Sequence, residues 1–466
     1  MLSVSGARGL VGQSMTPAVA ADFAAAFGSF IRTTTRRTDP LICIGRDGRP
    51  SGQALVHAAI AGLSATGCRV IDLGVVTTPT VAVMIGKHKA TGGMAITASH
   101  NPIEWNGLKC LNADGVAPPP GRAGEIIRRF KDRDFTFAPV TSAASISSDD
   151  SGPETHVEKV LAAIDPTPIR RAKFKVVLDS VNGSGCVAGR MLLERLGCKI
   201  VHLNGEPTGV FAHKPEPTET NLTDLAQLTK KSRAACGFAQ DPDADRLAVI
   251  DERGTYIGEE YTLVLAAKSV LERRAARGDR SPVIIAVNLS TSRMIDDLAA
   301  RYAGVKVVRT AVGEANVVAA MKRQSKKATI GGEGNGGVIL PQICWVRDSL
   351  SGMALILSLL ATTRKSLSEI VRDLPRYSMI KQKFDLTKIG GIAAVKPALQ
   401  RVIKKFADAD LSTLDGVRVD FGPPDPGWVH LRPSNTEPIV RLIAEATTES
   451  RAWELIDEAA VAAKLA

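Results

Sequence analysis

Three successive segments of this chain share one predicted order of elements: strand, helix, strand, helix, strand, loop and strand. The strands that open the segments are Leu41–Gly45, Lys175–Asp179 and Val283–Val287, each a short apolar run bounded by turn-forming residues. Strands that alternate with helices build a sheet that is covered by helices. The repeat therefore predicts three similar α/β domains, each with a mixed sheet.

The last part of the chain departs from this repeat from about Ser378 onward. Thr413–Asp420 is predicted as a hairpin strand and Val440–Ile443 as another, with helices around residues 394–407 and 450–465. These elements predict a small C-terminal α+β domain. We therefore expect four domains, at residues 1–140, 153–252, 255–366 and 378–466. Residues 138–153, rich in Ser, Ala, Asp and Pro, are predicted to form a linker.

The composition narrows the class of protein. Hydrophobic residues make up 44% of the 466 residues, enough for packed cores, which excludes a disordered chain. The formal charge of +11 suits an anionic partner, but aromatic residues are only 4% and are not interleaved with basic ones. We therefore expect no nucleic acid as partner. Most of these charges are expected to form solvated surface, with a modest contribution to attracting an anionic, phosphorylated small molecule. The sequence leaves the oligomeric state open.

Cysteine usage and hydropathy bear on the location of the protein. The seven cysteines are scattered and never form a CxxC pair, as expected for reduced thiols in a cytoplasmic protein. The N-terminus lacks the basic start and apolar core of a signal peptide. The longest apolar run, around residues 353–361, is too short to span a bilayer, so we expect no membrane partner.

The third strand of each repeated segment ends in a chemically unusual loop. The three loops contain Ala98-Ser-His100, Asp241-Pro-Asp-Ala-Asp-Arg246 and Gly331-Gly-Glu-Gly-Asn-Gly-Gly337. In α/β sheets, ligands and reacting groups collect at the carboxyl ends of the strands. Three equivalent positions with unusual chemistry therefore predict one composite site.

The first loop lies within Thr97–Lys109, read as TASHNPIEWNGLK, between two short apolar runs that are predicted as buried strands. Ser99 follows the end of a strand, a position suited to a nucleophile or to a carrier of a phosphoryl group. The alternative is an ordinary Asn-Pro turn whose serine caps the backbone. His100 and Lys109 lie in the same stretch and add an imidazole and a lysine side chain.

The second loop alternates three carboxylates, Asp241, Asp243 and Asp245. Carboxylates this close repel one another unless a cation lies among them, and hard oxygen ligands suit Mg²⁺. A solvated acidic turn is one alternative. A calcium loop of the EF-hand type is another, since Glu252 falls at its twelfth position, but Arg246 stands where that loop needs glycine. Arg246 is instead suited to stabilise charge on a transferring phosphoryl group.

Two glycine patterns raise the question of dinucleotide binding. Gly332–Gly337 matches GxGxxG formally but precedes a predicted strand, so that interpretation fails. Gly183, Gly185 and Ala188 lie between a strand and a helix, which makes a nicotinamide dehydrogenase the main competing enzyme class. The acidic residue expected after the next strand is missing, so we interpret these glycines as a tight turn. In the third loop Glu333 and Asn335 are suited to bind sugar hydroxyls.

A fourth loop, Arg432-Pro-Ser-Asn-Thr-Glu-Pro438, precedes Arg441. An arginine, two hydroxyls and an amide in one turn make a phosphate cradle, and a capped turn is the alternative.

The combination of these loops resembles the α-D-phosphohexomutase superfamily, which includes phosphoglucomutase/phosphomannomutase and phosphoglucosamine mutase. The resemblance covers essentially the whole chain. TASHNP is similar to the family's phosphoserine loop, DPDADR to its metal loop, GEGNGG to its sugar loop and RPSNTEP to its phosphate loop. Ser5–Gly9 and Pro215–Leu222 also match family patterns.

The resemblance implies four domains around a central cleft and a phosphorylated Ser99. Phospho-Ser99 would give its phosphoryl group to a sugar monophosphate, and the resulting sugar bisphosphate, also the activator, would turn over and return its other phosphate. By the same resemblance Ser99, Asp241, Asp243 and Asp245 hold one Mg²⁺. The resemblance also implies that Lys109 is the acid/base, with His100, Arg246 and Arg8 around the phosphoryl group. The implied substrate-binding residues are Glu333, Asn335, Gly313, Glu314, Arg432, Ser434, Asn435, Thr436 and Arg441.

Two departures bear on the substrate. Many bacterial members end the sugar loop with Ser-Gly-His, whereas Asn335-Gly-Gly337 ends it here, as in archaeal-type members. Gly313-Glu314 also resembles archaeal types. The expected function is interconversion of hexose 1-phosphate and 6-phosphate, with glucosamine phosphate or glucose and mannose phosphates as substrate. The alternatives are a serine-dependent sugar phosphatase and a non-catalytic sugar-phosphate-binding protein.

Overall fold

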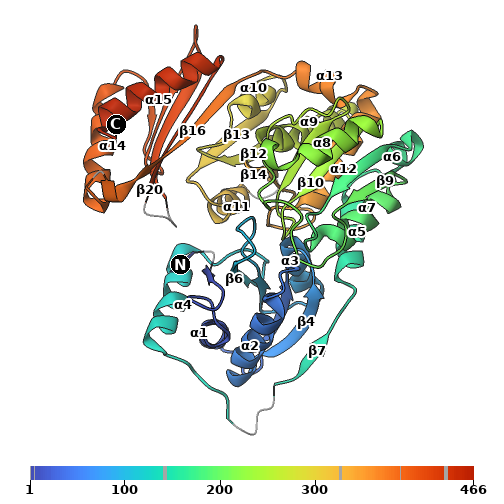
Figure 1. Cartoon of the computed structure of the whole chain (residues 1–466), viewed down its shortest axis with the longest axis vertical. Coiled ribbons are helices and arrows are strands. Elements are labelled where there is room, and N and C mark those ends of the chain that lie inside the picture. Colours follow the sequence, from blue (N-terminus) through green and yellow to red (C-terminus); the bar gives the residue numbers. More distant parts are fainter. Residues whose placement is uncertain are drawn as a thin grey trace. The chain divides into compact units, whose positions relative to one another are not determined.

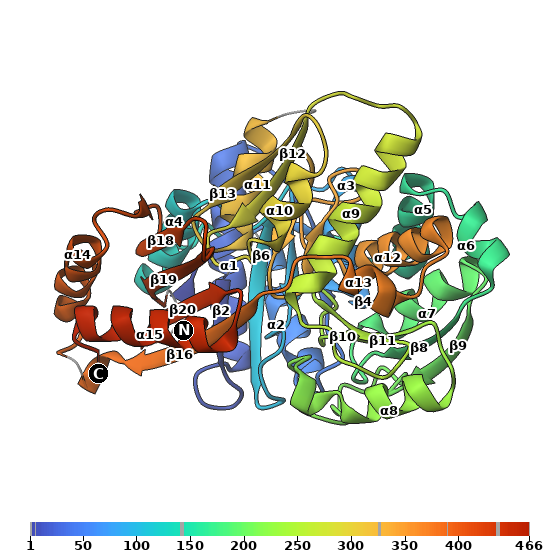
Figure 2. The same cartoon turned by 90° about the horizontal axis from the view of Figure 1, so that it is seen from above.

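The computed structural model describes residues 2–4, 6–139, 144–324, 328–388, 390–434 and 439–465 (Figures 1 and 2). The chain divides into two compact units. Unit 1 comprises Met1–Arg277 and Asn335–Val371, and unit 2 comprises Gly278–Gly334 and Arg372–Ala466. Each unit is described separately below.

The first domain of unit 1 is built on a seven-stranded sheet in the order β1-β2-β6-β5-β3-β4-β7. Strands β3, β4 and β5 are parallel, and β6 is antiparallel to β5. The elements are β1 (Leu2–Ser3), β2 (Gly6–Leu10), α1 (Pro17–Thr35), β3 (Leu41–Arg46), α2 (Gly52–Ala65), β4 (Arg69–Val75), α3 (Thr78–Lys87), β5 (Gly92–Ile96), β6 (Trp105–Asn112), α4 (Pro120–Asp132) and β7 (Ile146–Ser148).

Helices cover both faces of this sheet because its central strands alternate apolar side chains between two cores. One core joins Ile42 and Ile44 of β3 to α1, α2 and α4, and the other joins Cys43 to α3. Helix α1 begins where Thr16 Oγ1 accepts a hydrogen bond from Val19 N at 3.3 Å and Pro17 occupies the first turn. The three layers expose the carboxyl ends of β3 and β5 at one edge.

The second domain of unit 1 repeats this topology with the strand order β11-β10-β8-β9. Strand β8 pairs in parallel with β9 and β10, and β11 is antiparallel to β10. Its elements are α5 (Gly152–Ala163), α6 (Thr167–Ala172), β8 (Lys175–Asp179), α7 (Gly185–Arg195), β9 (Lys199–Leu203), α8 (Thr223–Lys231), β10 (Cys236–Gln240) and β11 (Leu247–Asp251). Unit 1 also contains α9 (Glu260–Ala276), β15 (Gly337–Ile339), α12 (Ser349–Thr363) and most of α13 (Leu367–Arg372).

Unit 2 contains the start of the third repeat and the C-terminal domain. In the third repeat β12 pairs in parallel with β13 and β14. The C-terminal sheet has the order β16-β20-β19-β18-β17, is antiparallel throughout, and packs against α14 and α15. The elements of unit 2 are β12 (Val283–Asn288), α10 (Met294–Ala300), β13 (Val305–Thr310), α11 (Glu314–Arg323), β14 (Ala328–Glu333), β16 (Ser378–Asp385), α14 (Val395–Lys405), β17 (Asp410–Ser412), β18 (Val417–Phe421), β19 (Gly427–Pro433), β20 (Ile439–Ala446) and α15 (Glu449–Ala463).

The predicted fold class, three mixed-sheet α/β domains and a C-terminal α+β domain, is confirmed, as is the repeated order of elements. The prediction of a linker at residues 138–153 was wrong in part. β7 (Ile146–Ser148) adds to the edge of β4, and α5 begins at Gly152. An edge strand needs only backbone hydrogen bonds, so its polar composition resembles that of a linker.

The predicted strand Thr413–Asp420 was wrong in part: residues 417–420 belong to β18, but residues 413–416 form the turn between β17 and β18. Gly416 in this turn has φ 68°, and a Cβ atom there would lie 2.1 Å from the Leu431 carbonyl oxygen. Only glycine fits such a turn.

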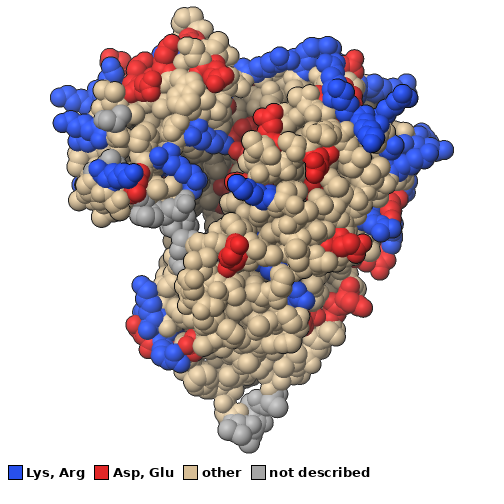
Figure 3. All heavy atoms as spheres, in the orientation of Figure 1, with Lys and Arg blue, Asp and Glu red and all other residues tan. Residues whose placement is uncertain are grey.

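Charge is distributed over the surface. On the face shown in Figure 3, Lys and Arg side chains are interspersed with Asp and Glu side chains. Within the described residues, no helix has the length and hydropathy needed to cross a membrane.

Candidate functional site

Ser99 lies in the loop between β5 and β6, buried and in the left-handed conformation with φ 52°. Its amide donates to Thr97 Oγ1 at 2.9 Å, and its hydroxyl donates to Asp241 Oδ2 at 2.9 Å. A non-glycine residue in this region of φ and ψ carries strain that the surrounding contacts must offset. The loop therefore presents the Ser99 hydroxyl to the acidic loop of the second domain.

Arg49, in the turn after β3, holds the backbone of the serine loop. Its guanidinium is fully buried and donates to four carbonyl oxygens of that loop, those of Ser99 (2.6 Å), Asn101 (2.8 Å), Pro102 (2.6 Å) and Trp105 (3.0 Å). Arg49 Nε also pairs with Asp47 Oδ2 at 3.0 Å, and Thr97 donates to that carboxylate. One arginine thus fixes the conformation in which Ser99 is presented.

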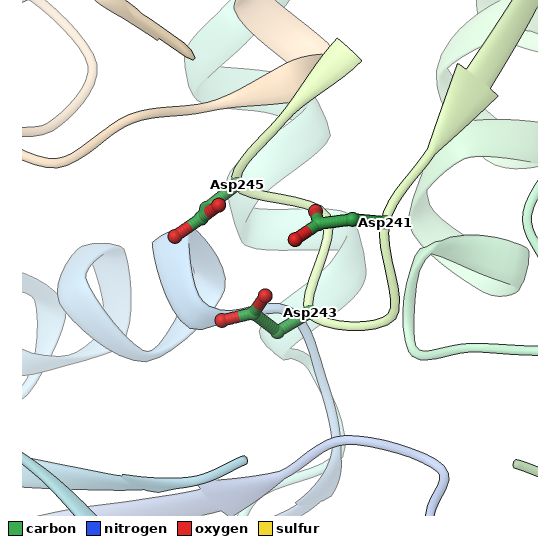
Figure 4. Close-up of side chains that lie close together, drawn as sticks. All are labelled: Asp241, Asp243 and Asp245. Carbon is green, nitrogen blue, oxygen red and sulfur yellow. The ribbon is translucent and has the colours of Figure 1, made fainter. Parts of the chain in front are cut away.

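Asp241, Asp243 and Asp245 follow β10 on one loop, and their carboxylates turn toward one another (Figure 4). All three are buried, and one ligand oxygen from each lies within 4.8 Å of the others. Asp243 Oδ1 and Asp245 Oδ1 have no hydrogen-bond partner among the described residues. Buried carboxylate oxygens without partners are costly, so this donor set fits a hard divalent cation such as Mg²⁺.

Burial and the neighbouring charges shift the pKa values of these three carboxylates. Burial and the adjacent Asp245 and Asp243 raise the pKa of Asp241 well above its ordinary value. Burial also acts to raise the pKa of Asp243 and of Asp245, but the nearby cations outweigh it and lower both. Burial and mutual repulsion therefore oppose a full negative charge on all three carboxylates, and a bound cation would offset that opposition.

Lys109 and Arg347 are the cations that contact this loop. Lys109 Nζ on β6 lies 2.6 Å from Asp243 Oδ2 and 3.3 Å from Asp245 Oδ2. Burial acts to lower the pKa of Lys109, but these carboxylates raise it overall, so the ammonium stays charged. Arg347 Nη2 lies 2.7 Å from Asp245 Oδ2.

Arg8, Arg246 and His100 lie near the acidic loop and the Ser99 hydroxyl. Arg8 on β2 is close enough to interact electrostatically with Asp243 and Asp245, and burial lowers its pKa. Arg246 Nε is buried without a hydrogen-bond partner among the described residues, 3.9 Å from Asp245 Oδ1. His100 Nδ1 lies 3.5 Å from Ser99 Oγ, and burial, with Arg246 and Arg8 nearby, lowers its pKa to about 2. The site is therefore suited to an anion beside Ser99.

The first and second domains support the acidic loop from two sides. Thr78, at the start of α3, donates from its hydroxyl to Asp243 Oδ2 at 2.6 Å and from its amide to the Asp243 carbonyl at 3.0 Å. Ser184 N donates to the Pro242 carbonyl oxygen at 2.9 Å. A Cβ atom on Gly183 would lie 2.7 Å from that same oxygen. The glycine turn therefore packs closely against Pro242, as expected for a tight turn.

The calcium interpretation fails on geometry. Glu252 accepts from the amide and the hydroxyl of Ser368, and residues 247–251 form strand β11. The residue that would complete an EF-hand loop is therefore engaged elsewhere.

The third loop contributes to both units. Glu333 ends β14 in unit 2, where its Oε1 accepts from Asn288 Nδ2 at 2.8 Å and from Gly313 N at 3.1 Å. Gly313 has φ 123° and precedes Glu314, the first residue of α11. Asn335 belongs to unit 1, and its buried Oδ1 has no partner among the described residues.

Arg432, at the end of β19, donates from Nε to Asp415 Oδ2 at 2.9 Å. The strand register places Arg432 opposite Arg441 on β20, and Arg441 opposite Lys383 on β16. Like charges opposite one another are destabilising, so this row of three cations is suited to an anion. Ser434 N donates to the Ile439 carbonyl at 2.9 Å. The predicted Asn435 and Thr436 lie outside the described residues.

The structure thus brings the predicted residues together in two groups. The group in unit 1 contains Ser99, His100, Lys109, Arg8, Arg246 and the three aspartates, and the group in unit 2 contains Glu333, Gly313, Glu314, Arg432, Ser434 and Arg441. Sequence reasoning missed Arg49, Arg347 and Asp415. Arg49 had a visible signal, since Arg46–Ser51 follows the first strand of its repeat as the unusual loops follow the third.

Comparison with known proteins matches the chain along its whole length. Residues 2–137, 154–254 and 258–377 match the models of phosphoglucomutase/phosphomannomutase α/β/α domains I, II and III, and residues 381–462 match the C-terminal domain. A relative from Thermococcus kodakarensis named "Phosphoglucomutase/phosphomannomutase" is 36% identical over 453 residues, covering 97% of this chain and 96% of the relative. A Methanopyrus kandleri relative named "Probable phosphoglucosamine mutase" is 35% identical over 458 residues, 97% of this chain and 95% of its own.

A solved structure agrees with these matches. The crystal structure of a phosphoglucomutase/phosphomannomutase family protein from Burkholderia thailandensis superposes with a TM-score of 0.83 at 28% identity. The superposition covers 100% of this chain and 98% of that one.

Proposed function

This chain belongs to the phosphoglucomutase/phosphomannomutase family of the α-D-phosphohexomutase superfamily, and from that premise we propose that Ser99 carries the phosphoryl group it transfers. The protein is an intramolecular phosphotransferase that interconverts hexose 1-phosphate and hexose 6-phosphate. The observation that carries the proposal is the Ser99 hydroxyl, presented by a strained loop 2.9 Å from Asp241 among three carboxylates and four cationic side chains.

Ser99, Asp241, Asp243 and Asp245 would hold one Mg²⁺, which neutralises charge on the phosphoryl oxygens when it is bound. Support comes from the two partnerless carboxylate oxygens and the raised pKa of Asp241. Arg246 and Arg8 are placed to stabilise the charge of the transferring phosphoryl group. Lys109, held as an ammonium by two aspartates, would give a proton to Ser99 Oγ as the Oγ–P bond breaks, and the resulting amine would take the proton that the attacking sugar hydroxyl loses, so the ammonium is restored. The return transfer to Ser99 uses the same two proton transfers in the opposite direction.

His100 assists as a neutral ring, since its pKa of about 2 keeps it uncharged at neutral pH. As an uncharged group it can orient the phosphoryl oxygens through one N–H without adding to the local positive charge. The sugar bisphosphate formed after the first transfer acts as intermediate and activator in this proposal. Its other phosphate is returned to Ser99, so both ends of the sugar must be accepted.

Most of the proposed substrate contacts belong to unit 2. Arg432, Ser434, Asn435, Thr436 and Arg441 would hold the phosphate that does not react, which the row of cations on β16, β20 and β19 supports. Glu333, Asn335, Gly313 and Glu314 would read the sugar. Glu333 is an anionic acceptor suited to neighbouring hydroxyls, and such contacts discriminate poorly at position 2. We therefore propose overlapping use of glucose, mannose and glucosamine phosphates. The seven free cysteines support a cytoplasmic location.

The test is conversion of hexose 1-phosphate to 6-phosphate by the purified protein with Mg²⁺ and a trace of sugar bisphosphate. Ser99→Ala should abolish conversion, whereas Ser281→Ala, at an exposed serine of unit 2, should leave it unchanged. Release of inorganic phosphate without formation of 6-phosphate would instead indicate a serine-dependent phosphatase. Tight binding of sugar phosphate with no conversion would indicate a non-catalytic binding protein.

A further inference from the structure

Asp415 lies in the turn between β17 and β18 of the C-terminal domain and joins two loops of unit 2. Its Oδ2 accepts a hydrogen bond from Val312 N at 3.0 Å and another from Arg432 Nε at 2.9 Å. The side chains of Asp415 and Arg432 are 15% and 6% exposed, so water screens their ion pair little. One carboxylate therefore binds the loop before α11 and the start of the phosphate loop at once.

The loop before α11 connects Asp415 to Glu333. Two successive amides of this loop donate to two different carboxylates: Val312 N to Asp415 and Gly313 N to Glu333 Oε1 at 3.1 Å. The two amides belong to adjacent peptide units that meet at the Val312 Cα, so a displacement of this short backbone segment moves both. The position of Glu333 is therefore linked through Val312 and Gly313 to Asp415, and through Asp415 to Arg432.

A second set of buried contacts joins the third repeat to the C-terminal domain within unit 2. The Arg418 guanidinium, 1% exposed, donates to the Leu289 carbonyl, and His430 Nδ1 lies 3.0 Å from Ser290 Oγ. Asn288, the residue before Leu289, is the other donor to Glu333. Glu333 is therefore fixed by two segments, each of which is tied separately to the C-terminal domain.

We propose that Asp415 is a positioning residue that couples the sugar-binding carboxylate of Glu333 to the phosphate-binding guanidinium of Arg432. This proposal rests on the proposed function, since it takes both residues to be substrate contacts. A substrate that binds both ends benefits when the two contacts are held at a set spacing before it arrives, because the ordering cost is already met. Neutralising the Asp415 carboxylate weakens both contacts, because one oxygen accepts both hydrogen bonds, and it leaves the reacting groups of unit 1 untouched.

Asp415→Asn should therefore raise KM by about tenfold while kcat stays within about twofold, since binding and not the transfer step loses its organisation. Asp425→Asn is the matched control: Asp425 pairs with Arg451 Nε at 3.1 Å in the same domain and has no hydrogen bond to Val312 or Arg432 among the described residues. The control should leave KM unchanged. Asp415→Glu keeps the charge with a longer arm and should give an intermediate KM.

A double-mutant cycle isolates the coupling. In a Ser99→Ala background that cannot turn over, calorimetry gives the Kd of glucose 1,6-bisphosphate for Glu333→Gln, Arg432→Lys and both together. With Asp415 present, the change in Kd of the double variant should differ by at least about threefold from the product of the changes in the two single variants. With Asp415→Asn, the change in Kd of the double variant should equal that product.

Additive effects in the presence of Asp415, or an unchanged KM in Asp415→Asn, would overturn the proposal. If Asp415→Asn fails to fold, the cycle with Asp415 and the KM of Asp415→Glu still decide the matter. A protein with Asp415 intact that neither converts nor binds sugar phosphates would instead contradict the proposed function.

Discussion

Replacing Arg49 with lysine tests whether one guanidinium fixes the backbone conformation of the serine loop. The Arg49 guanidinium makes five hydrogen bonds: one to Asp47 and four to the carbonyls of residues 99, 101, 102 and 105. A lysine ammonium has three donors, so at least two of these buried acceptors lose their partner. Each such loss costs about 1–3 kcal/mol, so we expect Arg49→Lys to lower the free energy of unfolding by about 2–6 kcal/mol.

The same change should slow turnover, because Ser99 in its left-handed conformation depends on these bonds. We expect kcat to fall by at least about a hundredfold, since small misplacements of a reacting group have effects of that size. Denaturant unfolding and steady-state kinetics measure the two quantities. The matched control is Arg46→Lys in the same turn, whose guanidinium bonds Gln53 Oε1 at 2.8 Å at an exposed position. Arg49→Lys with unchanged stability and unchanged kcat would refute the role assigned to Arg49.

Three further expectations follow from the structure. Chelation of Mg²⁺ should abolish turnover, and Asp243→Asn should lose activity far more than it loses stability; an enzyme insensitive to chelators would make the acidic loop purely structural. Burial lowers the pKa of His430 from 6.5 to about 4, so the folded state favours the neutral ring. The contribution of His430 to the free energy of unfolding is therefore complete above about pH 6.5. It falls by up to about 3 kcal/mol as the pH drops to about 4. Denaturant unfolding across this pH range should show a flatter profile for His430→Gln than for the parent, and identical profiles would contradict the assignment. Assays with glucose, mannose and glucosamine 1-phosphates should give values of kcat/KM within about a thousandfold, or roughly 4 kcal/mol, and a larger preference would reveal a dedicated contact at position 2.

The repeated topology was predictable because its evidence is local. Buried parallel strands such as Lys175–Asp179 appear as short apolar runs, and the unusual loops follow the third run of each repeat. The acidic loop was equally visible, since its three carboxylates are neighbours in sequence. Strand β7 and the β17–β18 turn were mispredicted because an edge strand and a glycine turn leave little compositional trace.

Residues whose role depends on distant partners were not predictable from the sequence. Arg49 contacts carbonyls that are 50 or more residues away, and Arg347 contacts Asp245 across 102 residues. Asp415 lies 103 residues from Val312. In the sequence each looks like an ordinary charged residue, because its partners are its neighbours only in the folded chain.

The central claim is that Ser99 itself donates the phosphoryl group to the sugar. The most direct measurement is a single turnover: the protein phosphorylated with labelled phosphate is mixed with unlabelled hexose 1-phosphate, and the label on Ser99 and on sugar is followed in time. Label should leave Ser99 at the rate at which it appears in hexose bisphosphate, fast enough to support steady-state turnover. Label that stays on the protein during turnover, or that appears as inorganic phosphate, would contradict it.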